Sequence, residues 1–235
     1  MFKAYRFKIH ELFKYRNMKA VVLAGGESLQ QYSEGDFPDA FIIAVNSTPL
    51  KLDKGARVDL CMVQDTHRTA LKNNPAFFSL DKSIPLQFIA SDWQAYADKR
   101  GNATIMQSRP HTHDKNKIGG TICAHGNTTA VSAVLEALRR GYTEVYLFGH
   151  DCSAGHSLHQ DGLIQKTIKE LNFAHSVAIA KGGAVYIASD SYLCQYNAVD
   201  SQELLLKRYT PTEQSIVESV PATVKKARSR KKNSV

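Results

Sequence analysis

The chain has 235 residues, of which 43% are hydrophobic and 22% charged, so it can bury a sizeable core and is not a wholly disordered chain. No stretch approaches the roughly 18 uninterrupted apolar residues of a membrane helix, so we expect a cytoplasmic protein without a transmembrane segment. The four cysteines are widely spaced and form no Cys-x-x-Cys pair, which excludes a zinc ribbon or a thioredoxin-type site.

The net charge of +8 is concentrated at the two ends of the chain. Residues 1–19 carry +5 and the run from Lys225 to Lys232 carries +6, which leaves −3 on the rest. Residues 1–18 are predicted to form a basic amphipathic extension, either a helix suited to a membrane surface or a start-site extension. Residues 201–235 are predicted to be a polar, basic, disordered tail. Such ends could bind nucleic acid or anionic lipid non-specifically, or could simply be solvated.

Short apolar runs rich in β-branched residues predict the strands of the body, residues 19–200. They lie at 19–24, 41–45, 58–63, 86–90, 103–107, 144–148 and 184–187. Helical patterns cover 128–140, with Asn127 as the expected N-cap, and 162–180. Strands that alternate with helices and are almost entirely apolar predict a Rossmann-like three-layer α/β fold with a mostly parallel sheet.

Ligands of open parallel sheets bind beyond the carboxyl ends of the strands, so the residues that follow the strands are the candidate site. The Gly-Gly-Glu-Ser turn at 25–28 predicts a phosphate-binding turn at the start of a helix, with a bare structural turn as the alternative. The segment 126–129 predicts a second anion-binding helix start, with plain capping as the alternative. The predicted nucleotide-binding residues are Gly25, Gly26, Ser28, Asn46, Gly126, Asn127, Thr128 and Thr129.

Two carboxylates and three histidines complete the candidate site. Asp65 and Asp151 each end a buried strand, where a carboxylate could hold Mg²⁺ or ribose hydroxyls; helix capping is the alternative for Asp65. His150, His156 and His159 follow the strand at 144–148. His156 and His159 have the His-x-x-His spacing of a metal-binding pair, but no acidic or cysteine ligand falls in register with them. A single histidine acting as general acid or base is therefore favoured over a metal site.

The sequence resembles a group of Rossmann-like transferases. Residues 21–29 resemble the opening strand and turn of this group, and Asn46 and the segment that ends at Asp65 fit its pattern. The longest match is 126–151, and 183–193 resembles the last strand. The chain thus resembles the MptE-like 6-hydroxymethylpterin diphosphokinase domain family, which is common in uncharacterised bacterial and phage proteins. It is similar in pattern to the bacterial CMP-sialic acid sialyltransferases.

The two resemblances imply different chemistry. The MptE-like group implies pyrophosphoryl transfer from ATP to a small hydroxymethyl acceptor, with Mg²⁺ held by Asp65 and Asp151. The sialyltransferases imply a CMP-sugar donor, no essential metal, and His159 as the base, because it lies just before the helix at 162–180; Asp151 is the second catalytic candidate. Their first turn reads Asn-Gly-Pro-Ser, and their tyrosine pair that steadies the leaving phosphate has no clear match here. A third hypothesis is a non-catalytic protein that binds nucleic acid or a membrane through its basic ends.

Overall fold

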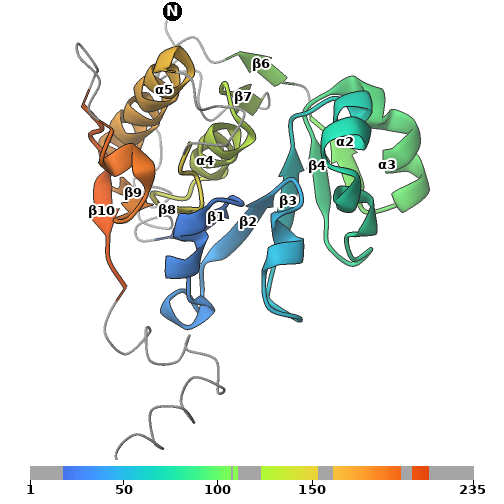
Figure 1. The fold of residues 1–235 in the computed structure, drawn as a ribbon, viewed down its shortest axis with the longest axis horizontal. Helices are drawn as coiled ribbons and strands as arrows, with labels where there is room; N and C mark the ends of the chain where they lie inside the picture. Colours follow the sequence, from blue (N-terminus) through green and yellow to red (C-terminus); the bar gives the residue numbers. More distant parts are fainter. Residues whose placement is uncertain (1–17, 107, 111–122, 153–160, 197–202, 212–235) are drawn as a thin grey trace, which may run out of the picture.

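An eight-stranded parallel sheet lies at the centre of the structure, in the order β10-β9-β8-β1-β2-β3-β4-β5 (Figure 1). This computed structural model describes residues 18–106, 108–110, 123–152, 161–196 and 203–211. The strands of the sheet are β1 (Lys19–Leu23), β2 (Phe41–Val45), β3 (Leu60–Val63), β4 (Leu86–Phe88), β5 (Ala103–Ile105), β8 (Glu144–Phe148), β9 (Ala184–Ala188) and β10 (Lys207–Tyr209). A separate parallel pair joins β6 (Ser108–Pro110) to β7 (Cys123–His125).

The direction in which strands are added reverses between β1 and β8. From β1 the chain builds β2 to β5 on one side. It then returns to place β8 on the other side of β1 and continues with β9 and β10. Because every pairing is parallel, all the carboxyl ends of the strands meet at one edge of the sheet. In an open α/β sheet, such a reversal is the usual place for a ligand.

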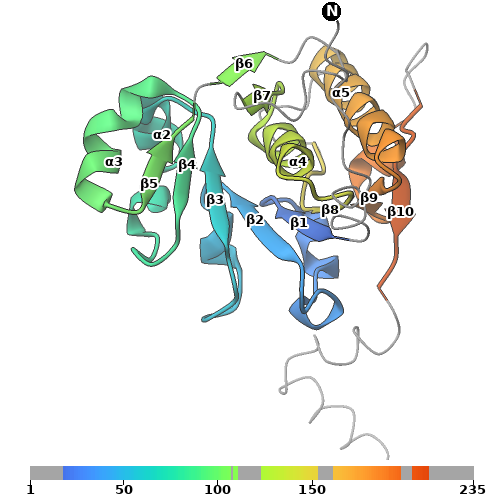
Figure 2. The ribbon, with the colours of Figure 1, turned by 180° about the vertical axis from the view of Figure 1, so that it is seen from behind.

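Helices cover both faces of the sheet (Figures 1 and 2). On one face, α4 and α5 pack together over the alternate apolar side chains of β1, β2, β8 and β9. On the other face, 3-10 segments with Phe37 cover β1, β2 and β8, and α2, η4 and α3 enclose Trp93 over β3 and β4. The helices are α2 (His67–Asn73), α3 (Gln94–Arg100), α4 (Thr129–Arg139) and α5 (Asp161–Ala180), and the 3-10 segments are η1 (Glu27–Gln31), η2 (Glu34–Asp36), η3 (Thr48–Lys51), η4 (Pro75–Ser79), η5 (Ser91–Trp93) and η7 (Tyr192–Cys194).

The predicted fold class is confirmed, and several boundaries differ from the expected ones. The strands expected at 58–63, 86–90 and 103–107 are shorter, as β3, β4 and β5 show. The glycine turn leads into the 3-10 segment η1, where an α-helix was expected. β10 pairs with β9 from a part of the chain that was assigned to the tail. The N-terminal extension at 1–17 and the residues after 211 lie outside the described ranges. Within those ranges, no helix is both long and apolar enough to cross a membrane.

The N-cap of α4 is Thr128, and the prediction of Asn127 at this position is wrong. The Thr128 side chain accepts a hydrogen bond from the Val131 amide at 3.1 Å. Asn127 is instead held by α5, because its Nδ2 donates to Thr167 Oγ1 at 2.8 Å. Both Asn and Thr are good N-cap residues, so local preference does not choose between them. Asn127 bonds to a residue 40 positions away, and Thr128 takes the N-cap position.

A buried carboxylate joins α4 to the sheet. Glu136 is fully buried and accepts hydrogen bonds from Arg139 Nε at 2.6 Å and Arg140 Nε at 2.8 Å. Arg140 also donates to Gln87 Oε1, on β4, at 2.9 Å. Burial raises the pKa of Glu136, but the hydrogen bonds and charges of the two arginines outweigh burial and hold the pKa below its ordinary value. Glu136 is therefore ionised at neutral pH and anchors this end of α4.

We expect Glu136→Gln to lower the free energy of unfolding by about 2 kcal/mol at pH 7. The expected loss is smaller than for a fully buried ion pair, because both arginine side chains reach solvent. A lowered folded-state pKa contributes stability above the unfolded pKa, about 4.3, and this contribution is lost as the pH falls through the folded value. The difference from wild type should thus persist from pH 6 to 8 and shrink below about pH 4. Urea unfolding of wild type and Glu136→Gln at these pH values measures the difference. Glu203→Gln is the control, because Glu203 is exposed. Equal stability of wild type and Glu136→Gln at pH 7 would contradict the assigned ion pair.

Candidate functional site

A cavity of about 440 Å³ opens at the carboxyl ends of β1, β2, β3 and β8, where the strand order reverses. Its walls are the segments that follow these strands, together with the first residues of α4 and the end of α2. The lining residues are Ala24, Gly25 and Gly26; Val45, Asn46, Ser47, Thr48 and Lys51; Gln64 and Asp65; Asn73 and Asn74; Asn127, Thr128, Thr129 and Ala130; and Gly149, His150, Asp151 and Cys152.

Most of the residues predicted from the sequence meet at this cavity. Those that line it are Gly25, Gly26, Asn46, Asp65, Asn127, Thr128, Thr129 and Asp151. Ser28 and Gly126 do not line the cavity. Their amides donate hydrogen bonds to Asp151 and Ser132, respectively. His159 and His156 lie outside the described residues, so the predicted role of His159 stays a prediction.

Ser28 and Asp151 fasten the first turn to the end of β8. The Ser28 amide donates to Asp151 Oδ2 at 2.8 Å, and the Ser28 hydroxyl donates to Asp151 Oδ1. The same hydroxyl oxygen accepts from the Gly149 amide at 2.9 Å, and the Gly26 amide donates to the Gly149 carbonyl at 2.7 Å. The amides of Gly26 and Ser28 are thus used within the protein and are not open to a phosphate, and phosphate binding by the turn as a whole stays a prediction.

The described residues do not fit a resident magnesium ion at Asp65 and Asp151. Both carboxylate oxygens of Asp151 accept hydrogen bonds from Ser28, and Asp151 is buried. Asp65 lines the cavity, where burial raises the pKa of its carboxyl group. Within the part of the chain that the structure describes, no three His, Cys, Asp or Glu side chains gather as a metal site. Asp65 and Asp151 therefore do not form a magnesium site in the described part of the chain.

The segment before α4 is also held by hydrogen bonds within the protein. The Gly126 amide donates to Ser132 Oγ at 3.0 Å, and the Asn127 amide donates to Glu170 Oε2 at 2.7 Å. Gln64 Nε2 donates to the Gly126 carbonyl at 2.9 Å. These bonds fix the position of the segment and engage the amides of Gly126 and Asn127. The N-cap Thr128 and the first residue of α4, Thr129, both line the cavity with polar side chains.

Two asparagine side chains in the wall have acceptor oxygens without a partner. Asn46 Oδ1 and Asn127 Oδ1 are both buried and accept no hydrogen bond from any described residue. Asn46 also has a φ of 53°, and Cys152 has a φ of 51°; among the described non-glycine residues these are the only positive values. Left-handed backbone and unpaired buried acceptors both cost free energy, and both are typical of ligand sites. Both unpaired oxygens belong to residues that line the cavity.

His150 and Lys51 are the remaining polar groups of note. His150 is buried, and its Nε2 lies 3.4 Å from Thr128 Oγ1. Lys51, at the end of η3, donates from Nζ to the Gly25 carbonyl. The cavity also has lining residues that were not among those predicted from the sequence: Lys51, Gln64, Ser47, Thr48, Asn73 and Asn74. Only Gln64 had a signal in the sequence, because it directly follows the predicted strand that ends at residue 63.

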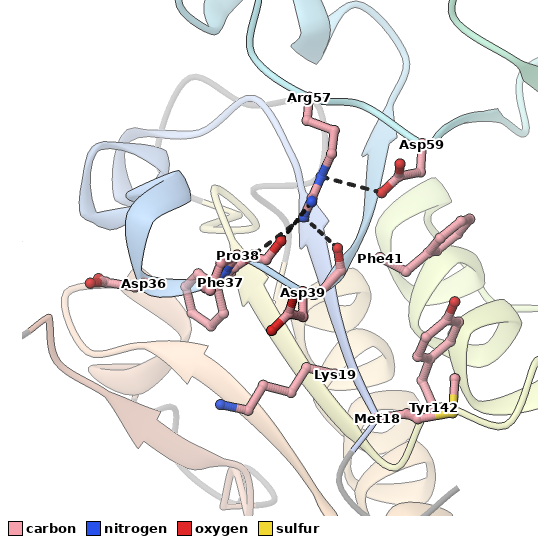
Figure 3. A pocket seen from close by; sticks show the side chains of 11 residues that line it. Met18, Lys19, Asp36, Phe37, Pro38, Asp39, Phe41, Arg57, Asp59 and Tyr142 are labelled. Carbon is pink, nitrogen blue, oxygen red and sulfur yellow. Dashed lines mark hydrogen bonds and ion pairs between the residues drawn. The ribbon is translucent and has the colours of Figure 1, made fainter. Parts of the chain in front are cut away.

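Two further cavities lie outside this site. One of about 780 Å³ lies between η1–η2 and the segment 51–56, and shares Gly25, Gly26 and Lys51 with the site. The other, of about 540 Å³, lies at the opposite edge, where β1 and β2 begin (Figure 3). There Arg57 donates to the carbonyls of Pro38 and Ala40 and lies 3.7 Å from Asp59 Oδ2, so its charge is used to hold the loop before β2.

Comparisons with known proteins give structural neighbours and nothing closer. No family model matches the chain, and no curated protein matches it. Structures of the sialyltransferase CstII from Campylobacter jejuni, with the substrate analogue CMP-3FNeuAc and with cytidine-5'-monophosphate, are each 13% identical and cover 86% of this chain and 98% of theirs, with TM-scores of 0.47 and 0.46. Monomeric CstII is 12% identical over 85% of this chain and 98% of its own, with a TM-score of 0.45. These values leave the chemistry of this chain to be inferred from its own residues.

The two glycines of the first turn should respond differently to a methyl group. A Cβ on Gly26 would lie 2.6 Å from the Gly149 carbonyl oxygen and overlap the Asp151 carboxylate. A Cβ on Gly25 would meet only the flexible end of Lys51, at 3.1 Å, as its nearest neighbour. We expect Gly26→Ala to lower the free energy of unfolding by about 1–3 kcal/mol and Gly25→Ala to change it by less than about 0.5 kcal/mol. Thermal unfolding of the pair measures this, and equal melting temperatures would contradict the structural role of Gly26.

Proposed function

We propose that the chain is a transferase that binds a CMP-sugar donor in the cavity at the β1–β8 reversal. The observation that carries the proposal is the pair of unpaired amide oxygens, Asn46 Oδ1 and Asn127 Oδ1, in a polar cavity at the place where open α/β sheets bind nucleotides. The exocyclic amino group of cytosine and the hydroxyls of ribose are donors that can satisfy such oxygens.

The charge of the cavity favours a donor with one ionised phosphate over ATP. Among the described lining residues, Lys51 is the only lysine or arginine, and Asp65 and Asp151 are the acids. A CMP-sugar carries one negative charge on its phosphodiester, whereas ATP carries several and normally needs Mg²⁺ to neutralise them. Because Asp151 is fully engaged with Ser28, the pair expected to hold that ion is not available. Pyrophosphoryl transfer from ATP with Mg²⁺ therefore has no support from the described residues.

The residues of the cavity divide into three tasks under this proposal. The Asn46 and Asn127 amide oxygens bind the nucleoside, and Asp65 accepts from a ribose hydroxyl. The hydroxyls of Thr128 and Thr129 donate to the phosphate. In the transfer, an acceptor oxygen attacks the carbon bonded to the phosphate oxygen, that C–O bond breaks, and CMP leaves with the electron pair. A base takes the acceptor proton, and His159 keeps this role as a prediction.

Isothermal titration with a set of nucleotides tests the proposal. CMP should bind without added metal, and dCMP should bind about 10-fold more weakly because it lacks the 2′-hydroxyl that Asp65 accepts from. Asp65→Ala should remove most of this preference for CMP over dCMP. ATP should bind more weakly than CMP with or without Mg²⁺. Tight binding of ATP only when Mg²⁺ is present would restore the diphosphokinase hypothesis. No binding of any nucleotide would favour a protein that acts through its basic ends.

The histidines can be separated by turnover and affinity. His159→Ala should reduce the turnover of a CMP-sugar by about 10²–10⁴ and leave CMP affinity nearly unchanged, as expected for a lost general base. His150→Ala should mainly weaken CMP binding, because His150 is buried beside Thr128 in the wall. His175→Ala is the control, since its Nδ1 accepts from the Val185 amide away from the cavity. The reverse result, with turnover lost only in His150→Ala, would transfer the role of base to His150.

A further inference from the structure

We infer that Lys51 forms the phosphate-binding subsite of this cavity, at the junction with the second cavity. The inference rests on the proposed function and adds to it a residue that binds the anion. Lys51 ends η3, the 3-10 segment that follows β2, and its Nζ reaches across to donate to the carbonyl of Gly25. This contact holds the ammonium group over the first turn, 3.1 Å from the position of a Cβ on Gly25.

Lys51 supplies a charge that the rest of the described wall lacks. Two backbone amides of the first turn are engaged within the protein, since the Gly26 amide donates to Gly149 and the Ser28 amide to Asp151. The first amides before α4 are likewise engaged by Ser132 and Glu170. A side-chain cation at this edge offers an anion a full positive charge, which these engaged amides do not provide. An ammonium group has three donors, of which the Gly25 carbonyl uses one, so two remain for phosphate oxygens.

The position of Lys51 also orients the ligand. Lys51, Gly25 and Gly26 are shared by the 440 Å³ cavity and the 780 Å³ cavity. The unpaired oxygens of Asn46 and Asn127 belong to the first cavity only. A phosphate at the junction thus places the nucleoside in the first cavity and directs the transferred group towards the second, whose wall includes Glu34 and Lys54.

Titrations of CMP and cytidine test whether Lys51 recognises the phosphate. Lys51→Gln removes the charge and keeps most of the length of the side chain. We expect it to weaken CMP binding by about 10- to 100-fold, with the loss reduced at high salt, and to leave cytidine binding unchanged. Lys54→Gln is the matched control, because Lys54 is also exposed and lines only the second cavity. Wild-type CMP affinity in Lys51→Gln, or an equal loss of CMP and cytidine affinity, would overturn the subsite.

A second measurement keeps this inference separate from the proposed function. Inorganic phosphate should shift the amide NMR resonances of Gly25 and Gly26 in the wild-type protein and in Lys54→Gln, and should not shift them in Lys51→Gln. Phosphate shifts that depend on Lys51, in a protein that does not bind CMP, would retain the subsite and reject the proposed donor. CMP binding that does not depend on Lys51 would retain the donor and reject the subsite, and the absence of phosphate shifts in the wild-type protein would also reject it.

Discussion

The structure depends on the hydrogen bonds that join the turn after β1 to the turn after β8. Asp151 holds Ser28 through both the amide and the hydroxyl, and Gly149 exchanges bonds with Gly26 and Ser28. Gly149 has a φ of 71°, and a Cβ there would overlap the carbonyl of Ala24. These bonds connect the first and second halves of the sheet where the strand order reverses. They set the distance between the two turns, and so they set the width of the candidate site.

The other side of the site is fixed by side chains that reach in from three elements. Gln64 follows β3, Ser132 lies on α4 and Glu170 lies on α5, and together they hold Gly126 and the Asn127 amide. Ser132 also donates to Gln64 Oε1 at 2.6 Å, so the hydrogen bonds form a closed network. Hydrogen bonds of this kind restrain the segment before α4, and so they restrict where Thr128 and Thr129 can lie.

The sequence predicts the sheet and the edge that carries the site, because both follow from local patterns. Buried parallel strands are apolar runs, and β1, β2 and β8 are largely such runs, followed within a few residues by glycine or polar residues. The roles of single residues depend on partners far along the chain. Ser28 donates a hydrogen bond to Asp151, 123 positions along the chain, and Asn127 donates one to Thr167, 40 positions along the chain. The residues next to Ser28 and Asn127 in the sequence therefore do not indicate these roles. Lys51 has no local signal either, because its place over Gly25 depends on how η3 folds back.

Four backbone amides at the carboxyl edge of the sheet donate to groups within the protein and are not free to bind a ligand. Phosphate sites of many Rossmann-like folds bind the anion through amides of a glycine turn and a helix start, which any residue type can provide. Here the amides of Gly26, Ser28, Gly126 and Asn127 serve the protein itself. Under the proposed function, side chains from other segments add to anion binding, with Lys51 as the charge and the two threonines as neutral donors. In such a site the engaged amides would hold the two turns and the segment before α4 in place, and the side chains would determine which ligand binds. A substitution of Lys51 would then change the affinity for an anion and leave the hydrogen bonds of these four amides intact.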